Sequence, residues 1–244
     1  MFTLLKKEVS GFLSSLIGYI VIAVFLLING LFLWLFASDF NILDFGFASL
    51  EGLFMIAPFV FLFLIPAITM RTFAEEQRLG TIEFLLTKPI TDLQIILAKY
   101  FAGLLLVLFS LLPTLIYFFS VYQLGLPKGN IDTGGMWGSY IGLLFLGAGF
   151  VAIGVFASSI AGNTIVAFIL AVFISLFFYV GFDFIHSLEL FGTVDLFIKA
   201  LGINAHYISM SRGVIDTRDL VYFISLIAFF LLLTRLSIES RKWQ

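Results

Sequence analysis

Residues 133–182 read TGGMWGSYIGLLFLGAGFVAIGVFASSIAGNTIVAFILAVFISLFFYVGF, and no Asp, Glu, Lys or Arg interrupts them. Because about 20 helical residues cross the roughly 30 Å hydrocarbon core of a bilayer, this run is long enough for two membrane-spanning helices. Near its middle, residues 158–164 read SSIAGNT, a cluster of small and polar residues that suits a tight turn. The run therefore predicts spans at 137–160 and 164–182 with a turn between them.

Four further runs lack charged residues, at 9–38, 52–70, 101–127 and 220–234. Each predicts one span, which gives six in total at about 16–36, 52–70, 95–119, 137–160, 164–182 and 219–236. A membrane β-barrel is disfavoured because the apolar residues run continuously instead of alternating with polar ones. We expect an all-α membrane protein whose residues 1–244 form one transmembrane domain.

The composition excludes most soluble classes. Of the 244 residues, 61% are hydrophobic and 11% are charged, whereas soluble domains have about 45–50% apolar and about 25% charged residues. The 13 Lys and Arg and 15 Asp and Glu are too few to cover a soluble globule of this size. Cysteine is absent, so disulfides, thiolate metal sites and a cysteine nucleophile are excluded as well.

Basic residues orient the predicted spans, because cytoplasmic loops near span ends carry an excess of Lys and Arg. An even number of spans puts both termini on one side, and that side collects Lys6, Lys7, Arg71, Arg78, Lys88, Lys99, Arg235, Arg241 and Lys242. The other side has only Lys128, Lys199, Arg212 and Arg218. We therefore expect both termini in the cytoplasm. The first apolar stretch is too long for a signal-peptide core, so we expect it to stay attached.

All charged residues fall in predicted loops or at predicted span ends. Proton relays and ion-coupled carriers usually place such residues inside the bundle, so this pattern weakens that class. No G-x-x-x-x-G-K-[ST] phosphate loop occurs, and no span offers an Asp, Glu or His to activate a nucleophile. We expect no catalytic residue and no enzyme activity, with energy supplied by another protein.

The remaining polar residues predict no special chemistry. Asn29, Ser110 and Thr114 are expected at depth, each bonded to a neighbouring helix or to its own backbone. His186 and His206 fall in the last outer loop without a carboxylate cluster or a ligand spacing around them. We expect solvated histidines there and no metal site.

The inner loop between the second and third predicted spans has clear helix boundaries. The second helix is expected to continue past the bilayer through Glu75 and Glu76 and to stop at Gly80, the usual left-handed cap residue. A short helix would follow, with Thr81 as its N-cap and Glu83 in its first turn, until Pro89 ends it. A capping box of Thr91 and Gln94, with Ile90 and Ile95 as a hydrophobic staple, then begins the third span.

Two interpretations of this short middle helix remain open. Its apolar side, formed by Ile82, Leu85 and Leu86, suits an interfacial helix that lies on the lipid headgroups. The same side suits a coupling helix docked into a cytoplasmic partner. The predicted extension of the second helix, about 13 Å for nine residues at 1.5 Å each, would hold it away from the bilayer and favours the second interpretation.

Two further segments carry recognisable patterns. In the fourth span Gly138 and Gly142 form a G-x-x-x-G pair, and Gly147 and Gly154 add small residues, so this helix can pack closely against another, in the same subunit or in a second one. Residues 183–218 are too polar to span and too apolar for a free loop, which predicts short re-entrant helices. At the outer mouth, Arg212, Gly213, Asp216, Arg218 and Asp219 are expected, with the charged ones pairing with each other or contacting exported cargo.

Several of these residues carry a resemblance to a known family. Glu75, Glu76, Gly80-Thr81-x-Glu83, Leu85-Leu86, Pro89-Ile90 and Lys99 resemble the segment between the second and third spans of ABC-2 type transporter permeases. The N-terminal segment, with Lys6-Lys7-Glu8, Phe12 and Ser14-Ser15, resembles the amphipathic helix that precedes the first span in that family. Residues 206–223 resemble the segment before the sixth span in GldF permeases, the branch associated with bacterial gliding motility.

The resemblance implies a transport mechanism and a set of partners. Two permease subunits would pair with two cytoplasmic ATPases, and the loop helix would seat in a groove of the ATPase. The implied coupling residues are Glu75, Glu76, Gly80, Thr81, Ile82, Glu83, Leu86 and Pro89. The implied partners are a GldA-like ABC ATPase that holds ATP and Mg, a GldG-like second permease or a second copy, and the lipid bilayer of the bacterial inner membrane, with no nucleic acid.

Two other functions remain as alternatives. The first is an ion-driven secondary transporter, against which the absence of charge within the predicted spans argues. The second is a membrane anchor of a motility complex that transports nothing. In either case the chain itself would bind no cofactor.

Overall fold

The computed structural model describes residues 1–44, 46–81, 90–189, 192–213 and 215–241. Within those residues the chain is all helical, without a strand. The first half contains α1 (Phe2–Ser14), α2 (Leu16–Trp34), α3 (Glu51–Thr69), α4 (Ala74–Arg78), α6 (Asp92–Leu111), the 3-10 turn η1 (Leu112–Thr114) and α7 (Leu115–Leu124). The second half contains α8 (Thr133–Ile160), α9 (Thr164–Leu176), the π turn η2 (Phe177–Gly181), α10 (Phe182–Ser187), η3 (Gly192–Val194), α11 (Asp195–Lys199), α12 (Ile203–Ser211) and α13 (Thr217–Arg241).

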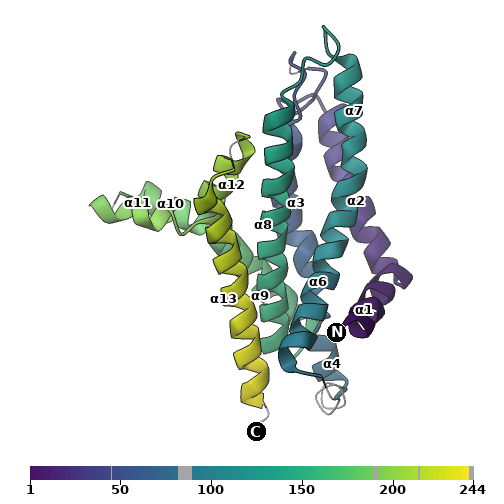
Figure 1. Ribbon diagram of the computed structural model, residues 1–244, viewed down its shortest axis with the longest axis vertical. Coiled ribbons are helices and arrows are strands. Elements are labelled where there is room, and N and C mark those ends of the chain that lie inside the picture. The colour runs from purple at the N-terminus through teal and green to yellow at the C-terminus, as the bar shows by residue number, and fades with distance from the viewer. Residues whose placement is uncertain (45, 82–89, 190–191, 214, 242–244) are drawn as a thin grey trace.

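Six helical stretches of the described chain are long and apolar enough to cross a membrane, which confirms the predicted number. They are Leu16–Trp34, Glu51–Arg78, Asp92–Leu124, Thr133–Ile160, Thr164–Ser187 and Thr217–Ser240. Both termini lie at the same end of the bundle, together with α1 and α4 (Figure 1). The side of the membrane on which this end lies stays a prediction.

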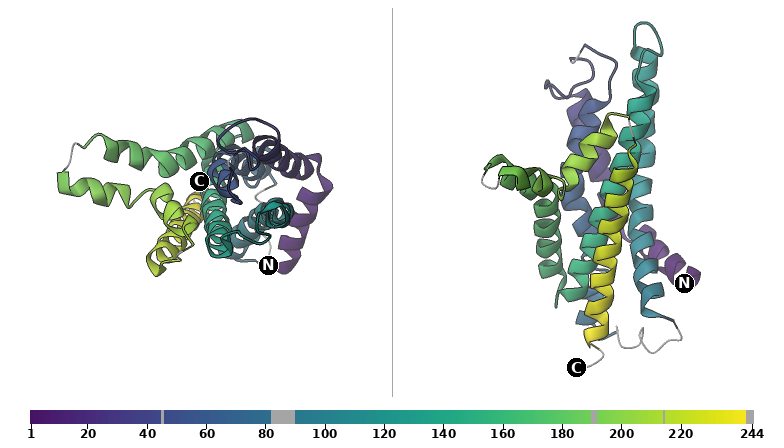
Figure 2. Two further views of the ribbon diagram at one scale, coloured as in Figure 1. Left: turned by 90° about the horizontal axis from the view of Figure 1, so that it is seen from above. Right: turned by 60° about the vertical axis from the view of Figure 1, so that its left-hand side comes forward.

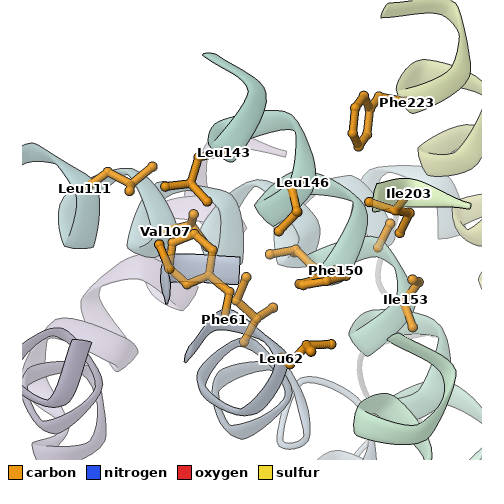
Figure 3. Close-up of a cluster of buried hydrophobic side chains, with 14 of the residues drawn as sticks. Phe61, Leu62, Val107, Leu111, Leu143, Leu146, Phe150, Ile153, Ile203 and Phe223 are labelled. Atoms are coloured by element: carbon orange, nitrogen blue, oxygen red, sulfur yellow. The ribbon is translucent and has the colours of Figure 1, made fainter. Parts of the chain in front are cut away.

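α8 is the most buried of the six stretches and forms the centre of the bundle. It packs against α3, α6, α9, α12 and α13. Its large side chains Leu143, Leu146, Phe150 and Ile153 are fully buried and meet side chains of α3, α6, α12 and α13 around them (Figure 3). The fourth predicted span is therefore the helix on which the others assemble.

The local turn signals produce the expected breaks. Asn163 caps α9 by accepting a hydrogen bond from the Val166 N–H at 2.8 Å, three residues after α8 ends at Ile160. Thr91 caps α6, and both hydrogen bonds of its capping box with Gln94 are present at 3.4 Å. Pro113 lies in the 3-10 turn between α6 and α7, so the third span bends and runs on to Leu124, beyond its predicted end.

The fifth span differs from a plain helix at its C-terminal end. α9 passes into η2 and then into α10, and α10 and α11 project sideways from the bundle before α12 returns to it (Figures 1 and 2). We call α10 and α11 the lateral arm. Short helices were expected in this region, and their re-entrant position in a bilayer stays a prediction.

Candidate functional site

The end of the bundle that holds both termini also holds the described flanks of the segment that the sequence singles out for coupling. The prediction of one continuous helix to Leu79 is wrong, because α3 ends at Thr69 and a turn precedes α4. The cause is Ser158 on α8. Its hydroxyl accepts hydrogen bonds from the N–H groups of Phe73 and Ala74 and donates one to the carbonyl of Met70, each at 3.0 Å. A single hydroxyl thus satisfies backbone groups that the break in the helix leaves open.

α4 is short and well fixed. The Gln77 side chain donates a hydrogen bond to the Ser159 carbonyl at 2.8 Å, which ties α4 to the end of α8. After α4, Gly80 has a φ of 68°, and the Thr81 N–H bonds the Glu76 carbonyl at 2.9 Å, a Schellman-type stop. The helix therefore ends at the predicted glycine. Gly80 and Thr81 are exposed at this end of the molecule.

Four of the predicted coupling residues, Ile82, Glu83, Leu86 and Pro89, lie outside the described residues. The described part of the predicted site is formed by Glu75, Glu76, Gly80 and Thr81 on one side of the gap and by the capped start of α6 on the other. Both ends of the segment are therefore held by specific hydrogen bonds.

A buried ion-pair cluster joins α4 and α6, the helices on either side of this segment in the sequence, to α1. The Lys99 ammonium on α6 is 2.9 Å from Glu76 Oε1 on α4 and 3.2 Å from Glu8 Oε1 on α1. Its side chain is only 1% exposed, against 14% for Glu8 and 20% for Glu76. The same ammonium lies 5.1 Å from the centre of the Phe73 ring. One cation therefore joins α4 and α6 to α1, whose Glu8 is 91 positions from Lys99 in the sequence.

The coupling cluster, Glu8, Glu76 and Lys99, carries one more negative than positive charge. Glu76 Oε2 is buried and has no hydrogen-bond partner among the described residues. A hollow of about 280 Å³ adjoins the cluster, and Arg71 and Glu75 also line it. The region is thus polar and partly open at the end of the bundle where the termini lie.

Lys99 is the residue that the sequence interpretation missed as a site. The prediction that no charge is enclosed by the helices is wrong, because Lys99 lies inside the predicted span 95–119 and is fully buried. A signal existed: Lys99 stands alone among Ile95, Ile96, Ala98 and Tyr100. A buried cation requires a partner, and two acids, Glu8 and Glu76, were predicted at the same membrane edge.

The opposite end of the bundle contains a cavity of about 950 Å³ between α3, α8, α12 and η2. Of the predicted outer-mouth residues, Arg212 lines it. Gly213, with a φ of 82°, packs closely against Gly135 and Gly138 at the start of α8. Asp216 instead accepts a hydrogen bond from the Arg218 N–H at 2.9 Å, so its side chain bonds a backbone group in the first turn of α13.

Asp219 and His206 pair with each other, which corrects two predictions. His206 Nδ1 lies 2.7 Å from Asp219 Oδ1, and Nε2 lies 2.8 Å from the Ala200 carbonyl. The ring also stacks on Tyr222 at 3.9 Å between centres. His206 is therefore no solvated loop residue, and Asp219 pairs with it instead of with Arg212 or Arg218. The contact fastens the base of the lateral arm to α13.

The glycines of α8 approach helices of the same chain. A Cβ on Gly138 would lie 2.7 Å from Gly213 Cα, and one on Gly154 would lie 2.8 Å from Thr69 Cβ on α3. Gly142 faces Met210 on α12, and Gly147 faces Val107 on α6. Close packing of this helix thus takes place within the subunit.

The polar residues at depth bond as expected. Asn29 donates to the Phe25 carbonyl, Ser110 to the Val107 carbonyl, and Thr114 to the Leu111 carbonyl. The Thr114 hydroxyl also lies 3.0 Å from the Tyr140 hydroxyl on α8. Across the described ranges, no group of three His, Asp or Glu side chains is placed to hold a metal ion.

The geometry therefore gives a bundle of six candidate spans with the Lys99 ion pairs at one end and a cavity at the other. A comparison with curated proteins finds no matching sequence. The profile of one protein family, described as ABC-2 family transporter protein, matches residues 2–238, nearly the whole chain. Members of that family are non-catalytic membrane permease subunits of ABC transporters. The chain belongs to the ABC-2 family of transporter proteins.

Proposed function

We propose that this chain is the permease of an exporter driven by a separate cytoplasmic ATPase, which engages the segment between α4 and α6. The single observation that carries this proposal is the Lys99 cluster, which ties α4 to both α1 and α6. A force applied to the segment would reach three helices at once, because buried ion pairs resist separation. ATP and Mg would be bound by the partner ATPase.

The coupling roles follow from position. Glu76 would transmit movement to α6 through Lys99, and Gly80 and Thr81 would present the segment to the ATPase from an exposed helix end. Glu75 would contribute to the polar hollow beside them. Ile82, Glu83, Leu86 and Pro89 would form the part of the segment that contacts the ATPase groove.

The absence of cysteine makes a direct test possible. A Thr81→Cys variant, isolated with its native complex after treatment with a bifunctional thiol-to-amine cross-linker, is expected to be joined to a protein that contains an ATP-binding cassette. The matched control is Lys128→Cys, exposed at the other end of the bundle, which should give no such product. Cross-linking of both variants to the ATPase, or of neither, would count against the proposal.

A functional readout completes the test. Gly80→Ala forces an L side chain into a positive φ and is expected to shift the segment. In the reconstituted complex, transport should fall while ATP hydrolysis continues, and the bundle should melt as in the wild type. Transport driven by an ion gradient without ATP would instead establish a secondary carrier.

We also propose a role in gliding motility, with a GldA-like ATPase and a GldG-like second permease in the bacterial inner membrane. Support comes from the resemblance of residues 206–223 to the GldF branch. Genes for an ATPase and a second permease beside this one, together with loss of gliding on deletion, are the expected findings. A complex that hydrolyses ATP but moves no cargo would favour the membrane-anchor role.

A further inference from the structure

The cavity at the end of the bundle away from the termini changes polarity along its depth. Glu51 at the start of α3, Asp132 at the start of α8 and Arg212 after α12 line it at the helix ends. Phe59 is eight residues further along α3, which places it about 12 Å deeper at 1.5 Å per residue. There its ring meets that of Tyr179 at 5.7 Å. The cavity thus has a charged mouth and an aromatic interior.

The interior offers apolar surface to a ligand but few free polar groups. Met55 and Phe59 remain 50% and 54% exposed although they line the cavity. Two polar groups of the wall already bond within the protein: the Tyr207 hydroxyl donates to the Phe54 carbonyl at 2.7 Å, and the Ser139 hydroxyl donates to the Ser211 carbonyl at 2.9 Å. A hydrocarbon chain could lie against this wall without breaking these hydrogen bonds.

The mouth of the cavity, in contrast, is lined by charged side chains. Neither the Arg212 guanidinium nor the Glu51 carboxylate has a side-chain partner in the part of the chain that the structure describes. Asp132 Oδ1 accepts a hydrogen bond from the Gly135 N–H at 2.9 Å, and the residue is exposed. One base and two acids complement a headgroup that carries both a negative and a positive group.

From this arrangement we infer that the cavity binds a zwitterionic amphiphile of the aminophospholipid type. The phosphate would pair with Arg212, and the ammonium would pair with Glu51 and Asp132. An acyl chain would lie against Met55 and Phe59. The volume of about 950 Å³ is at the upper end of ordinary ligand cavities, about 300–1,000 Å³.

The inference that this lipid is the exported cargo rests on the proposed permease function. The inference that the cavity binds the lipid does not depend on that function. The test therefore uses the full chain in phosphatidylcholine nanodiscs without ATPase or ATP. The probe is a phosphatidylethanolamine with a photoactivatable diazirine in its acyl chain. We expect peptides from residues 51–69 to be labelled, and unlabelled phosphatidylethanolamine to compete better than phosphatidylglycerol.

Two variants and a control make the result specific. Arg212→Gln should lower labelling about tenfold, the size expected for loss of one charge-assisted hydrogen bond. Arg218→Gln is the matched control, since Arg218 is exposed nearby but does not line the cavity. Met55→Trp should also abolish labelling by filling the interior while leaving Arg212 in place.

Several outcomes would overturn the inference. They are unchanged labelling in both Arg212→Gln and Met55→Trp, or equal competition by phosphatidylglycerol. A third is a disulfide-linked dimer formed by Met55→Cys, which would show that a second copy of the chain covers the cavity. A failed transport assay would not affect these readouts, so loss of the permease proposal and loss of this one are separable.

Discussion

Lys99 shows how one side chain can tie distant parts of this bundle together. Its side chain is 1% exposed, and its ammonium pairs with two carboxylates from α1 and α4. Burial of a charge is costly unless it is paired and hydrogen-bonded. The position therefore fixes where Glu8 and Glu76 must lie, and with them the ends of two helices.

Lys99→Met is expected to destabilise the protein and to release α1. The two carboxylates would then face each other without a cation, and removal of one member of a buried pair costs up to about 3–5 kcal/mol. The melting temperature should fall, and hydrogen exchange should rise over Phe2–Ser14. Lys6→Met, on the exposed side of α1, is the control.

A second variant separates charge from packing. Combining Lys99→Met with Glu8→Gln and Glu76→Gln removes the unpaired charges and should recover most of the lost stability, because an apolar replacement of a buried ion cluster is often tolerated. A single Lys99→Met variant as stable as the wild type would show that the cluster does not hold α1.

At the scale of single residues, the sequence correctly predicts features that depend only on residues nearby in the chain. Gly80 stops α4 and Thr91 caps α6, because each needs only neighbours three to five residues away. The partners of Lys99 and His206 were not predictable in this way. Glu8 is 91 positions from Lys99, and the Ala200 carbonyl and Asp219 reach His206 only after the lateral arm has folded back.

At the scale of elements, uncharged runs predicted the spans but not how they bend. The break between α3 and α4 depends on Ser158, which the second span meets only once α8 has packed beside it. The π turn at the end of α9 and the sideways course of the lateral arm also left no recognised signal in hydropathy, which records length and burial but not direction.

The close approach of α3 and α8 at Gly154 can be tested by substitution. Gly154→Ala would place a Cβ 2.8 Å from Thr69 Cβ, so α3 and α8 would have to separate, at a cost of about 1–3 kcal/mol for overpacking. We expect a lower melting temperature in detergent. Gly11→Ala is the control, because nothing lies within 4 Å of its new Cβ and alanine favours a helix by about 0.5–1 kcal/mol.

A second substitution tests whether the steric clash between positions 154 and 69 causes the loss of stability. Thr69→Ala removes Oγ1 and Cγ2, two of the three Thr69 atoms that the new methyl group meets, and leaves Cβ in place. The double variant should therefore regain part of the lost stability. If the double variant is no more stable than Gly154→Ala, contact between these two positions does not limit how closely α3 and α8 approach.

At the scale of the whole molecule, the two ends of the bundle differ in kind. The end with both termini (Figure 1) carries α1 and α4. The coupling cluster and the exposed Gly80 and Thr81 belong to this end, while the cavity lined by Glu51, Asp132 and Arg212 lies at the other. Under the proposed permease function, one end would receive energy from the ATPase and the other would admit cargo. The charge distribution predicts which end carries the coupling segment, whereas the cavity depends on how α3, α8 and α12 come together.

Charge also predicts which end faces the cytoplasm. Basic residues gather at the end with the termini, and cytoplasmic segments carry such an excess. Because the chain has no cysteine, single-cysteine variants report each end without background. With a membrane-impermeant maleimide, Lys128→Cys should react in intact cells with a permeable outer membrane, and Thr81→Cys only after the inner membrane is opened. The cysteine-free chain is the control, and the reverse pattern would place the coupling cluster outside, where no ATP-driven partner could reach it.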